Sequence, residues 1–306
     1  MSPTLFKIIA WIFTIITLSG NCFIVVLIVS RKHLRSSKLN WFIISLAVAD
    51  FLVGLSLYPP LFFCERSFSC HTILMKSFRW IFIYSSVSNL CAMTVDRYVA
   101  ITSPIHHRTK VSERVVVMCI TLSWLVPAVL RGVVFIPLYY VYEQKALKYG
   151  LPILLVIFEA LPCLLILFAV IRISIIAKRQ KVQHRNKSKG RANQTKDENQ
   201  RSSTALRMIL FVAFFFVFCY LFEVYYSTCK TFFESCKDAE VLQMIQRLFL
   251  IANSAVNPFA YAYFKRDIKE EVKGKLYVLC RITNLELNAQ PNTEPEVQSV
   301  PLDEIS

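Results

Sequence analysis

The chain has 306 residues, of which 55% are hydrophobic and 18% charged, and its mean hydropathy is +0.49. This apolar content exceeds that of ordinary soluble domains and excludes a fold whose surface is covered by polar side chains. The formal net charge of +15 would suggest a nucleic-acid partner in a soluble protein, but the basic residues lie between apolar runs, so we expect contact with the lipid bilayer and no nucleic acid.

Seven apolar windows follow one another along the chain. A helix that crosses the bilayer needs about 20 mostly apolar residues. Inside lipid the backbone must form its own hydrogen bonds, which a helix achieves. We therefore predict an all-α integral membrane protein, a seven-transmembrane helix bundle. The predicted spans are residues 5–30, 40–63, 72–101, 115–139, 149–177, 204–228 and 239–263.

Basic residues in the connections predict the orientation. They gather after the first, third and fifth spans, and short loops rich in Lys and Arg face the cytoplasm. The N-terminus is then extracellular and the C-terminus cytoplasmic in a multi-pass protein. We assign residues 1–281 to the membrane domain, with a basic cytoplasmic loop at about 178–203, and residues 282–306 to a disordered tail.

Asp50 lies near the middle of the second span. A charged side chain at this depth costs about 3 kcal/mol or more, so it needs polar neighbours. Other spans supply hydroxyl and amide groups, which together with a carboxylate suit a small hard cation or ordered water; the sequence leaves both open. The candidate neighbours are Asn21, Ser86, Asn253, Ser254 and Asn257.

Arg79 lies in the first half of the third span, and Arg97 lies near its end, within the triplet Asp96-Arg97-Tyr98. The eighteen residues between the two arginines make five helical turns, so both lie on one helix face. Three further charged residues occupy the same half of other spans as Arg79: Glu159, Glu223 and Arg247.

Two interpretations of these four charges stay open. In the first, the two acids and two bases neutralise one another as internal salt bridges. In the second, they line a pocket for a small anionic or zwitterionic ligand oriented by Arg79 and Arg247. The second interpretation places Ile83 and Tyr220 in the same pocket.

Four cysteines lie near span ends, and two of them, Cys229 and Cys236, flank a short outer loop. In an oxidising compartment this pair is our favoured disulfide. A pair formed by Cys64 and Cys70 is the next candidate.

The seventh span contains Asn257-Pro258-Phe259-Ala260-Tyr261. Proline removes one helical hydrogen bond and kinks the helix. A kink beside a polar cluster predicts a helix that changes shape.

Together these features resemble the rhodopsin-like (class A) G-protein-coupled receptors, over about residues 5–280. The resemblance rests on motifs that occur in the family's order and in the expected spans. They are Gly20-Asn21, Leu46 to Asp50, Asp96-Arg97-Tyr98, Trp124, Pro162 and Asn257-Pro258-x-x-Tyr261.

The resemblance implies a plasma-membrane receptor that binds an extracellular small molecule or short peptide and activates a heterotrimeric G protein. It implies that Arg97 reaches the G protein when the sixth helix moves outward, and that Asp96 restrains Arg97 at rest. It also implies an amphipathic eighth helix from Phe264 to Leu279, with Cys280 as a lipidation site. The activation set that it implies is Asp96, Arg97, Tyr98, Pro104, Tyr220, Asn257, Pro258 and Tyr261.

No cofactor is implied beyond an allosteric sodium ion. The resemblance places that ion among Asp50, Ser86, Asn253, Ser254 and Asn257.

Several positions depart from the family pattern. Tyr220 and Phe222 stand where the family has Trp and Pro, Val170 replaces a tyrosine, and Ser202 replaces an acid that pairs with the third-helix arginine. These changes predict an altered basal activity of unknown sign.

Positions on the predicted extracellular side of the bundle depart from the family pattern as well. Arg79 stands where receptors for monoamines carry an aspartate, which argues against a simple monoamine ligand. The outer loop at 131–148 lacks the cysteine of the usual bridge, which makes the chain loosely similar to melanocortin, lipid and adenosine receptors.

Two other functions remain as alternatives: a transporter or channel whose pathway passes Asp50, or a receptor-like scaffold without coupling. The halves of the chain show no repeat, which disfavours a transporter. No catalytic constellation converges, so we do not expect an enzyme.

Overall fold

A computed structural model describes residues 3–60, 72–187, 194–232 and 240–289, and every element within these ranges is helical. The predicted all-α membrane fold is therefore confirmed. The chain divides into two compact units, Met1–Lys269 and Glu270–Ser306. The helix bundle belongs to the first unit, and the second begins inside the last helix.

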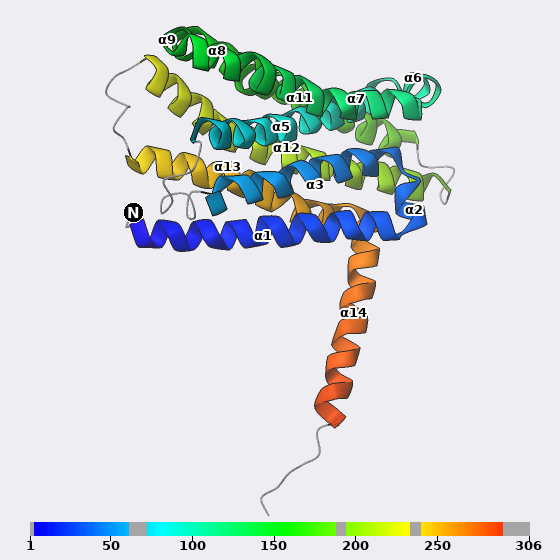
Figure 1. The fold of residues 1–306 in the computed structure, drawn as a ribbon. Coiled ribbons are helices and arrows are strands. Elements are labelled where there is room, and N and C mark those ends of the chain that lie inside the picture. Colours follow the sequence, from blue (N-terminus) through cyan, green and yellow to red (C-terminus); the bar gives the residue numbers. More distant parts are fainter. Residues whose placement is uncertain (1–2, 61–71, 188–193, 233–239, 290–306) are drawn as a thin grey trace, which may run out of the picture. The chain divides into compact units, whose positions relative to one another are not determined.

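Long helices form the bundle, and they run side by side (Figure 1). The first three spans are α1 (Pro3–Ser30), α3 (Lys38–Leu57) and α5 (Thr72–Thr102), with the short α2 (Lys32–Arg35) after α1 and α6 (Pro104–Lys110) after α5. The last two spans are α12 (Gln194–Phe232) and α13 (Glu240–Phe264). The final helix is α14 (Arg266–Ala289).

The fourth and fifth spans contain π-helical stretches. The fourth comprises α7 (Glu113–Pro127), η1 (Ala128–Phe135) and α8 (Ile136–Val141). The fifth comprises α9 (Glu143–Lys145), η2 (Ala146–Gly150), α10 (Leu151–Leu155), η3 (Val156–Ala160) and α11 (Leu161–Lys187). Prolines break the usual hydrogen-bond register nearby: Pro127 ends α7 directly before η1, and Pro162 follows η3.

The outer loop expected at 131–148 is wrong, because helix occupies nearly all of it. Only Tyr142, with φ −138° and ψ 62°, separates α8 from α9. The predicted fourth span stopped at residue 139 and the fifth began at 149, but Tyr and Lys side chains suit helix ends near a membrane surface, so the helix continues through them. Helix also covers most of the predicted basic loop, since α11 reaches Lys187 and α12 starts at Gln194. Likewise, α14 continues to Ala289, beyond the boundary set at residue 281.

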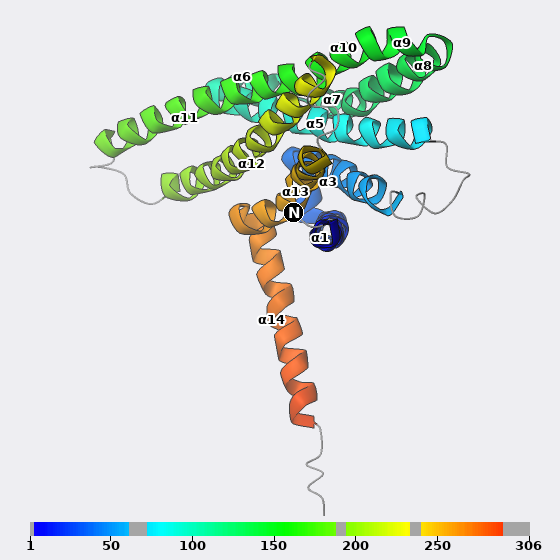
Figure 2. The ribbon, with the colours of Figure 1, turned by 90° about the vertical axis from the view of Figure 1, so that its left-hand side faces the viewer.

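The helices pack as a ring, and Figure 2 shows them after a 90° turn, with α1 seen end-on. α3 contacts α1, α5 and α13; α11 contacts α5 and α12; and α13 contacts α12 and α1, which closes the ring. α7 lies against α5 and α3, where Trp124 donates a hydrogen bond of 2.9 Å to Ser45. Ser45 in turn donates to Asn89 at 2.7 Å, so three spans are joined inside the bundle.

α1 approaches α13 closely at Gly20. A Cβ built on Gly20 would lie 3.1 Å from the ring of Pro258. One residue later, Asn21 donates hydrogen bonds to the carbonyl oxygens of Thr17 and Ser254. The Gly20-Asn21 pair therefore positions the kinked seventh span.

Five described helices are long and apolar enough to cross a membrane. They are α1, α3, α12 and the composite helices of the fourth and fifth spans. α5 and α13 are as long but more polar, and they carry most of the candidate functional residues. Their polar faces meet the interior of the ring, which explains how a bundle accommodates them.

Candidate functional site

The carboxylate of Asp50 lies at the centre of a fully buried polar cluster. Ser86 and Ser254 donate hydrogen bonds of 2.7 and 2.8 Å to Oδ1, and Asn257 donates one of 2.7 Å to Oδ2. The donors come from α5 and α13, so one carboxylate in α3 ties three spans together. Asn253 is buried as well, but it makes no hydrogen bond to Asp50 among the described residues.

This cluster contains carboxylate, hydroxyl and amide oxygens, although Asn257 turns its amide nitrogen to Asp50. A carboxylate with hydroxyl and amide oxygens suits a hard cation such as sodium. A transition-metal site is a different matter, because no described group of three or more His, Cys, Asp or Glu residues lies close enough to hold a metal ion. The residues present therefore fit sodium.

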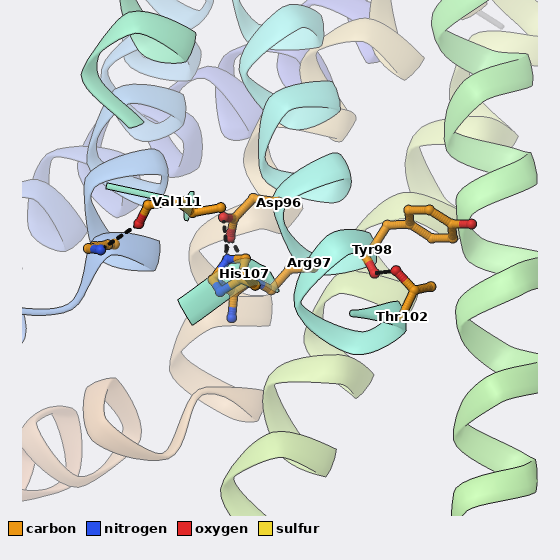
Figure 3. A network of polar contacts seen from close by, with 7 residues as sticks. Asp96, Arg97, Tyr98, Thr102, His107 and Val111 are labelled. Atoms are coloured by element: carbon orange, nitrogen blue, oxygen red, sulfur yellow. Dashed lines mark hydrogen bonds and ion pairs between the residues drawn. The ribbon is translucent and has the colours of Figure 1, made fainter. Parts of the chain in front are cut away.

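Arg97 and Asp96 meet at the end of α5, at what we call the Arg97 end of the bundle (Figure 3). Nε and Nη2 of Arg97 lie 2.9 and 2.5 Å from Oδ2 of Asp96. His107, in α6, places Nε2 2.9 Å from Oδ1 of the same carboxylate. Asp96 thus holds Arg97 through one oxygen and His107 through the other.

Tyr98, the third residue of the triplet, contacts residues near the turn that follows α5 and a residue of α11. Thr102 donates a hydrogen bond of 2.8 Å to the carbonyl oxygen of Tyr98, whose ring lies 6.2 Å from that of Phe168. Pro104 begins α6 and is exposed. Lys38 donates to the carbonyl oxygen of Val111 at 2.6 Å, which fixes the chain after α6 against α3 (Figure 3).

A buried lysine lies at the same end, directly after α13. Lys265 donates hydrogen bonds to Asn40, 225 residues earlier, and to Asp267 at 2.6 Å. Burial lowers the pKa of Lys265, although the Asp267 carboxylate opposes this. Burial alone would raise the pKa of Asp267, but the charge and hydrogen bond of Lys265 outweigh it, and the pKa lies below its ordinary value of 3.8.

The opposite end, which we call the Arg79 end, contains a cationic pair. Arg79 in α5 and Arg247 in α13 are both half-buried and lie close enough to repel each other. Arg79 donates a hydrogen bond of 3.4 Å to the carbonyl oxygen of Ser56, and the buried Tyr58 is near both guanidinium groups. Neither arginine forms an ion pair with any residue that the structure describes.

Two buried carboxylates lie at the same end. Glu159 is 2% exposed and Glu223 1% exposed, and they interact electrostatically with each other. The Tyr84 hydroxyl lies 3.5 Å from Glu159, and its ring stacks on Phe158 at 4.4 Å. Among the residues that the structure describes, no ion pair joins Arg79 or Arg247 to Glu159 or Glu223, so the salt bridges of the first interpretation are not seen between these four.

Tyr220 and Ile83, predicted to line the same pocket, are both buried. Tyr220 interacts electrostatically with Glu223 and Glu159, and its ring stacks on Phe216 at 4.3 Å. Ile83 lies one turn from Arg79 on α5.

Sequence reasoning missed Arg131, which it assigned to an outer loop. In the structure Arg131 belongs to η1, is 4% exposed, and interacts electrostatically with Tyr84 and Glu159. Its guanidinium lies 4.0 Å from the ring centroid of Phe135. The available signal was the apolar sequence on both sides of Arg131, which continues the fourth span.

Among the predicted activation residues, Tyr261 is fully buried, and its hydroxyl makes no hydrogen bond with any described residue. Val170, at a position where the family carries a tyrosine, has no hydroxyl. The side chain of Ser202 lies outside the described residues.

Cys229 forms a disulfide bond, and its predicted partner Cys236 lies outside the described residues, so that pairing stays a prediction. Cys64 and Cys70 also lie outside the described residues, as does the side chain of Cys280.

Comparison with known proteins gives a consistent result. The sequence model of the family "7 transmembrane receptor (rhodopsin family)" matches residues 20–261. The chain is 26% identical to "Octopamine receptor beta-2R" of Chilo suppressalis, over 90% of this chain and 81% of that protein. It is 26% identical to "Trace amine-associated receptor 8b" of Rattus norvegicus, over 86% of this chain and 84% of that protein.

A shorter match concerns "Trace amine-associated receptor 6" of Homo sapiens, with 35% identity over 40% of this chain and 36% of that protein. By their names these relatives are octopamine and trace amine receptors. They differ from the melanocortin, lipid and adenosine receptors with which the sequence was loosely compared.

Proposed function

Because this chain belongs to the rhodopsin family of 7 transmembrane receptors, we propose that it activates a heterotrimeric G protein in response to an extracellular ligand. The observation that carries this proposal is the Asp96–Arg97 pair at the end of α5, with Arg97 Nη2 2.5 Å from the carboxylate. An arginine held by its neighbour can be released to a partner when the surrounding helices move. Outward movement of α12 is the proposed trigger.

We place the Arg97 end in the cytoplasm of a plasma-membrane protein, with the N-terminus outside. The basic residues after α1 and around α6 and α7 support this orientation. The Arg79 end, with its buried charges, then faces outward and receives the ligand. α14, which begins at Arg266, is proposed to lie on the inner leaflet. The named relatives are receptors, a non-enzymatic family, and we propose no catalytic activity.

We further propose that sodium binds at Asp50 as an allosteric ion. Ser86, Ser254 and Asn257 surround its carboxylate, and turning their hydroxyl and amide oxygens toward a cation would complete the site. The ion would neutralise a buried charge and stabilise one arrangement of α3, α5 and α13.

The central experiment compares two neighbouring substitutions. Arg97→Ala and Asp96→Asn are expressed with wild type in cells lacking other receptors, and G-protein activation is measured at equal surface expression. Arg97→Ala is expected to abolish activation, whereas Asp96→Asn is expected to raise ligand-independent activation because it removes the charge that holds Arg97. If all three proteins activate equally, the receptor does not signal through this pair.

The same experiment separates the alternatives. An uncoupled scaffold predicts no activation by any of the three proteins. A transporter or channel predicts ion or solute flux that depends on Asp50 and is indifferent to Arg97→Ala.

A further inference from the structure

The junction between α13 and α14 contains a buried ammonium group. Lys265, the single residue between these two helices, is 5% exposed. Its Nζ donates hydrogen bonds to Oδ1 of Asn40, which is fully buried in the first turn of α3, and to Oδ2 of Asp267 at 2.6 Å. We call these three residues the Lys265 cluster. The cluster joins two segments that lie 225 residues apart in the sequence.

The backbone of Lys265 is bound to both helices. Its N–H donates to the carbonyl oxygen of Tyr261 at 3.0 Å, and its carbonyl oxygen accepts from the N–H of Lys269 at 2.8 Å. Pro258 lies seven residues earlier inside α13, where a proline removes one helical hydrogen bond. If the end of α13 moves about this proline, the Lys265 ammonium moves relative to Asn40.

Packing alone does not require a charge at this position. An ammonium group removed from water is costly unless oxygen acceptors compensate it, and a methionine would fill similar space without that cost. The acceptors compensate the charge only while Asn40 and Asp267 keep their places. Solvent reaches the cluster, since the side chain of Asp267 is 38% exposed. The flexible stem of Lys265 therefore gives its ammonium two favourable places, in the cluster and in water.

The first turn of α3 is also connected to the Asp96–Arg97 pair. In this turn Lys38 donates a hydrogen bond of 2.6 Å to the carbonyl oxygen of Val111, the residue that follows α6 (Figure 3). Within α6, His107 lies 2.9 Å from Asp96, the carboxylate that holds Arg97. The same turn of α3 thus receives the Lys265 cluster on one side and the contacts that lead to Arg97 on the other.

We infer that Lys265 is a positioning residue for the proposed coupling. In the resting receptor it holds the end of α13 on the first turn of α3. When Arg97 is released from Asp96, Lys265 leaves Asn40 for water, and the end of α13 can then move with α12, which packs against it. This inference rests on the receptor function proposed above and adds a regulatory contact at the same end of the bundle.

The test measures how fast the Lys265 amine reacts with an acylating reagent. The full-length receptor in lipid nanodiscs, without G protein, is treated with N-hydroxysuccinimidyl acetate and analysed by peptide mass spectrometry. Lys273, an exposed lysine of α14, is the reference within the same molecule. In wild type, Lys265 is expected to react at least about 10-fold more slowly than Lys273, because its charge-assisted hydrogen bonds must open first.

One variant tests the link to Arg97. Asp96→Asn removes the charge that holds Arg97, and it is expected to raise the reaction rate of Lys265 at least about 3-fold. A lysine buried for stability alone would keep its wild-type rate. Glu113→Gln, which removes an exposed carboxylate at the start of α7, is the matched control and keeps the wild-type rate as well.

Two substitutions of Asn40 test the cluster itself. Asn40→Leu removes an acceptor and is expected to raise the Lys265 rate at least about 10-fold. Asn40→Asp keeps an oxygen acceptor and adds a negative charge, so it is expected to lower the rate below that of wild type. Thermal melting verifies that each variant is folded, and Asn40→Asp still tests the cluster if Asn40→Leu does not fold.

The inference is overturned if Lys265 reacts as fast as Lys273 in wild type, or if it reacts no faster in Asp96→Asn than in Glu113→Gln. G-protein activation by the same variants in cells separates this inference from the proposed coupling. If Asp96→Asn exposes Lys265 but no variant activates a G protein, the coupling fails and the release of Lys265 stands. If Asp96→Asn raises activation without changing the Lys265 rate, the positioning role fails and the coupling stands.

Discussion

His107 Nε2 lies 2.9 Å from Asp96 Oδ1, so the carboxylate that restrains Arg97 is shared with a second basic side chain. His107 belongs to α6, eleven residues beyond Asp96, and the turn at Ser103 brings it back against α5. His107 occupies one of the two oxygens through which Asp96 can hold Arg97. The strength of the Asp96–Arg97 interaction therefore depends on the position of His107 in α6.

Replacing His107 with glutamine is expected to lower ligand-independent G-protein activation about 2- to 5-fold. Removing the imidazole that competes for the carboxylate strengthens the Asp96–Arg97 pair by an amount typical of a single partly exposed ion pair. The measurement is basal activation at equal surface expression. His33→Gln changes an exposed histidine in α2 and serves as the control. Unchanged or increased activation in His107→Gln would contradict the sharing of Asp96.

Replacing Asp50 with asparagine is expected to abolish stabilisation by sodium. The melting temperature is measured in sodium chloride and in choline chloride. If the sodium concentration is roughly ten times the dissociation constant, the free energy of unfolding of wild type rises by about 1.4 kcal/mol, which raises its melting temperature by about 2–4 °C. Asn253→Ala removes a buried side chain that does not hydrogen-bond Asp50, so it should retain the sodium response. If Asp50→Asn is stabilised by sodium as much as wild type, sodium does not bind at Asp50.

Replacing Gly20 with alanine is expected to destabilise the receptor by about 1–3 kcal/mol, because the new Cβ would meet the Pro258 ring at 3.1 Å and a rigid ring cannot yield. Gly274→Ala is the matched control, since a Cβ at Gly274 meets nothing within 4 Å. Alanine also favours the helix there by about 1 kcal/mol. Thermal melting of both variants should shift in opposite directions, and a parallel shift would argue against the close approach of α1 and α13.

Acid is expected to remove the stability that Asp267 contributes. A carboxyl group whose pKa is lowered in the folded protein stabilises it above its ordinary value of 3.8, and that stability is lost as the pH falls below this value. Melting temperature measured between about pH 6 and pH 3 should therefore fall more steeply for wild type than for Asp267→Asn. Identical slopes would mean that Lys265 does not hold the Asp267 carboxylate.

The spans and the Asp50 cluster were predictable because their signals are local. Hydropathy marks a span whatever its neighbours are, and one buried carboxylate requires polar partners, which here are Ser86, Ser254 and Asn257. The Asp96–Arg97 contact was expected from the resemblance, and adjacent residues can meet without help from the fold.

The contacts that sequence reasoning missed depend on how distant segments meet. Lys265 reaches Asn40 across 225 residues, and no spacing rule relates them. Arg131 was missed for another reason: it was counted in the outer loop at 131–148 although the predicted fourth span reached residue 139, and the π-helical stretch around it continues the helix. Hydropathy reports the free-energy cost of placing a charged side chain in lipid. It does not report whether that side chain faces the interior of the bundle, where polar neighbours lower the cost.

The single residue between α8 and α9 has a mechanical consequence. Because only Tyr142 joins Val141 to Glu143, the adjoining ends of the fourth and fifth spans are held within about 7 Å, two Cα–Cα steps. A long connecting loop would allow these two helix ends to separate at little entropic cost, whereas a connection of one residue keeps them together. A shift of the fifth span, which carries Glu159, is therefore transmitted to the fourth span, which carries Arg131, and the two spans respond as one body.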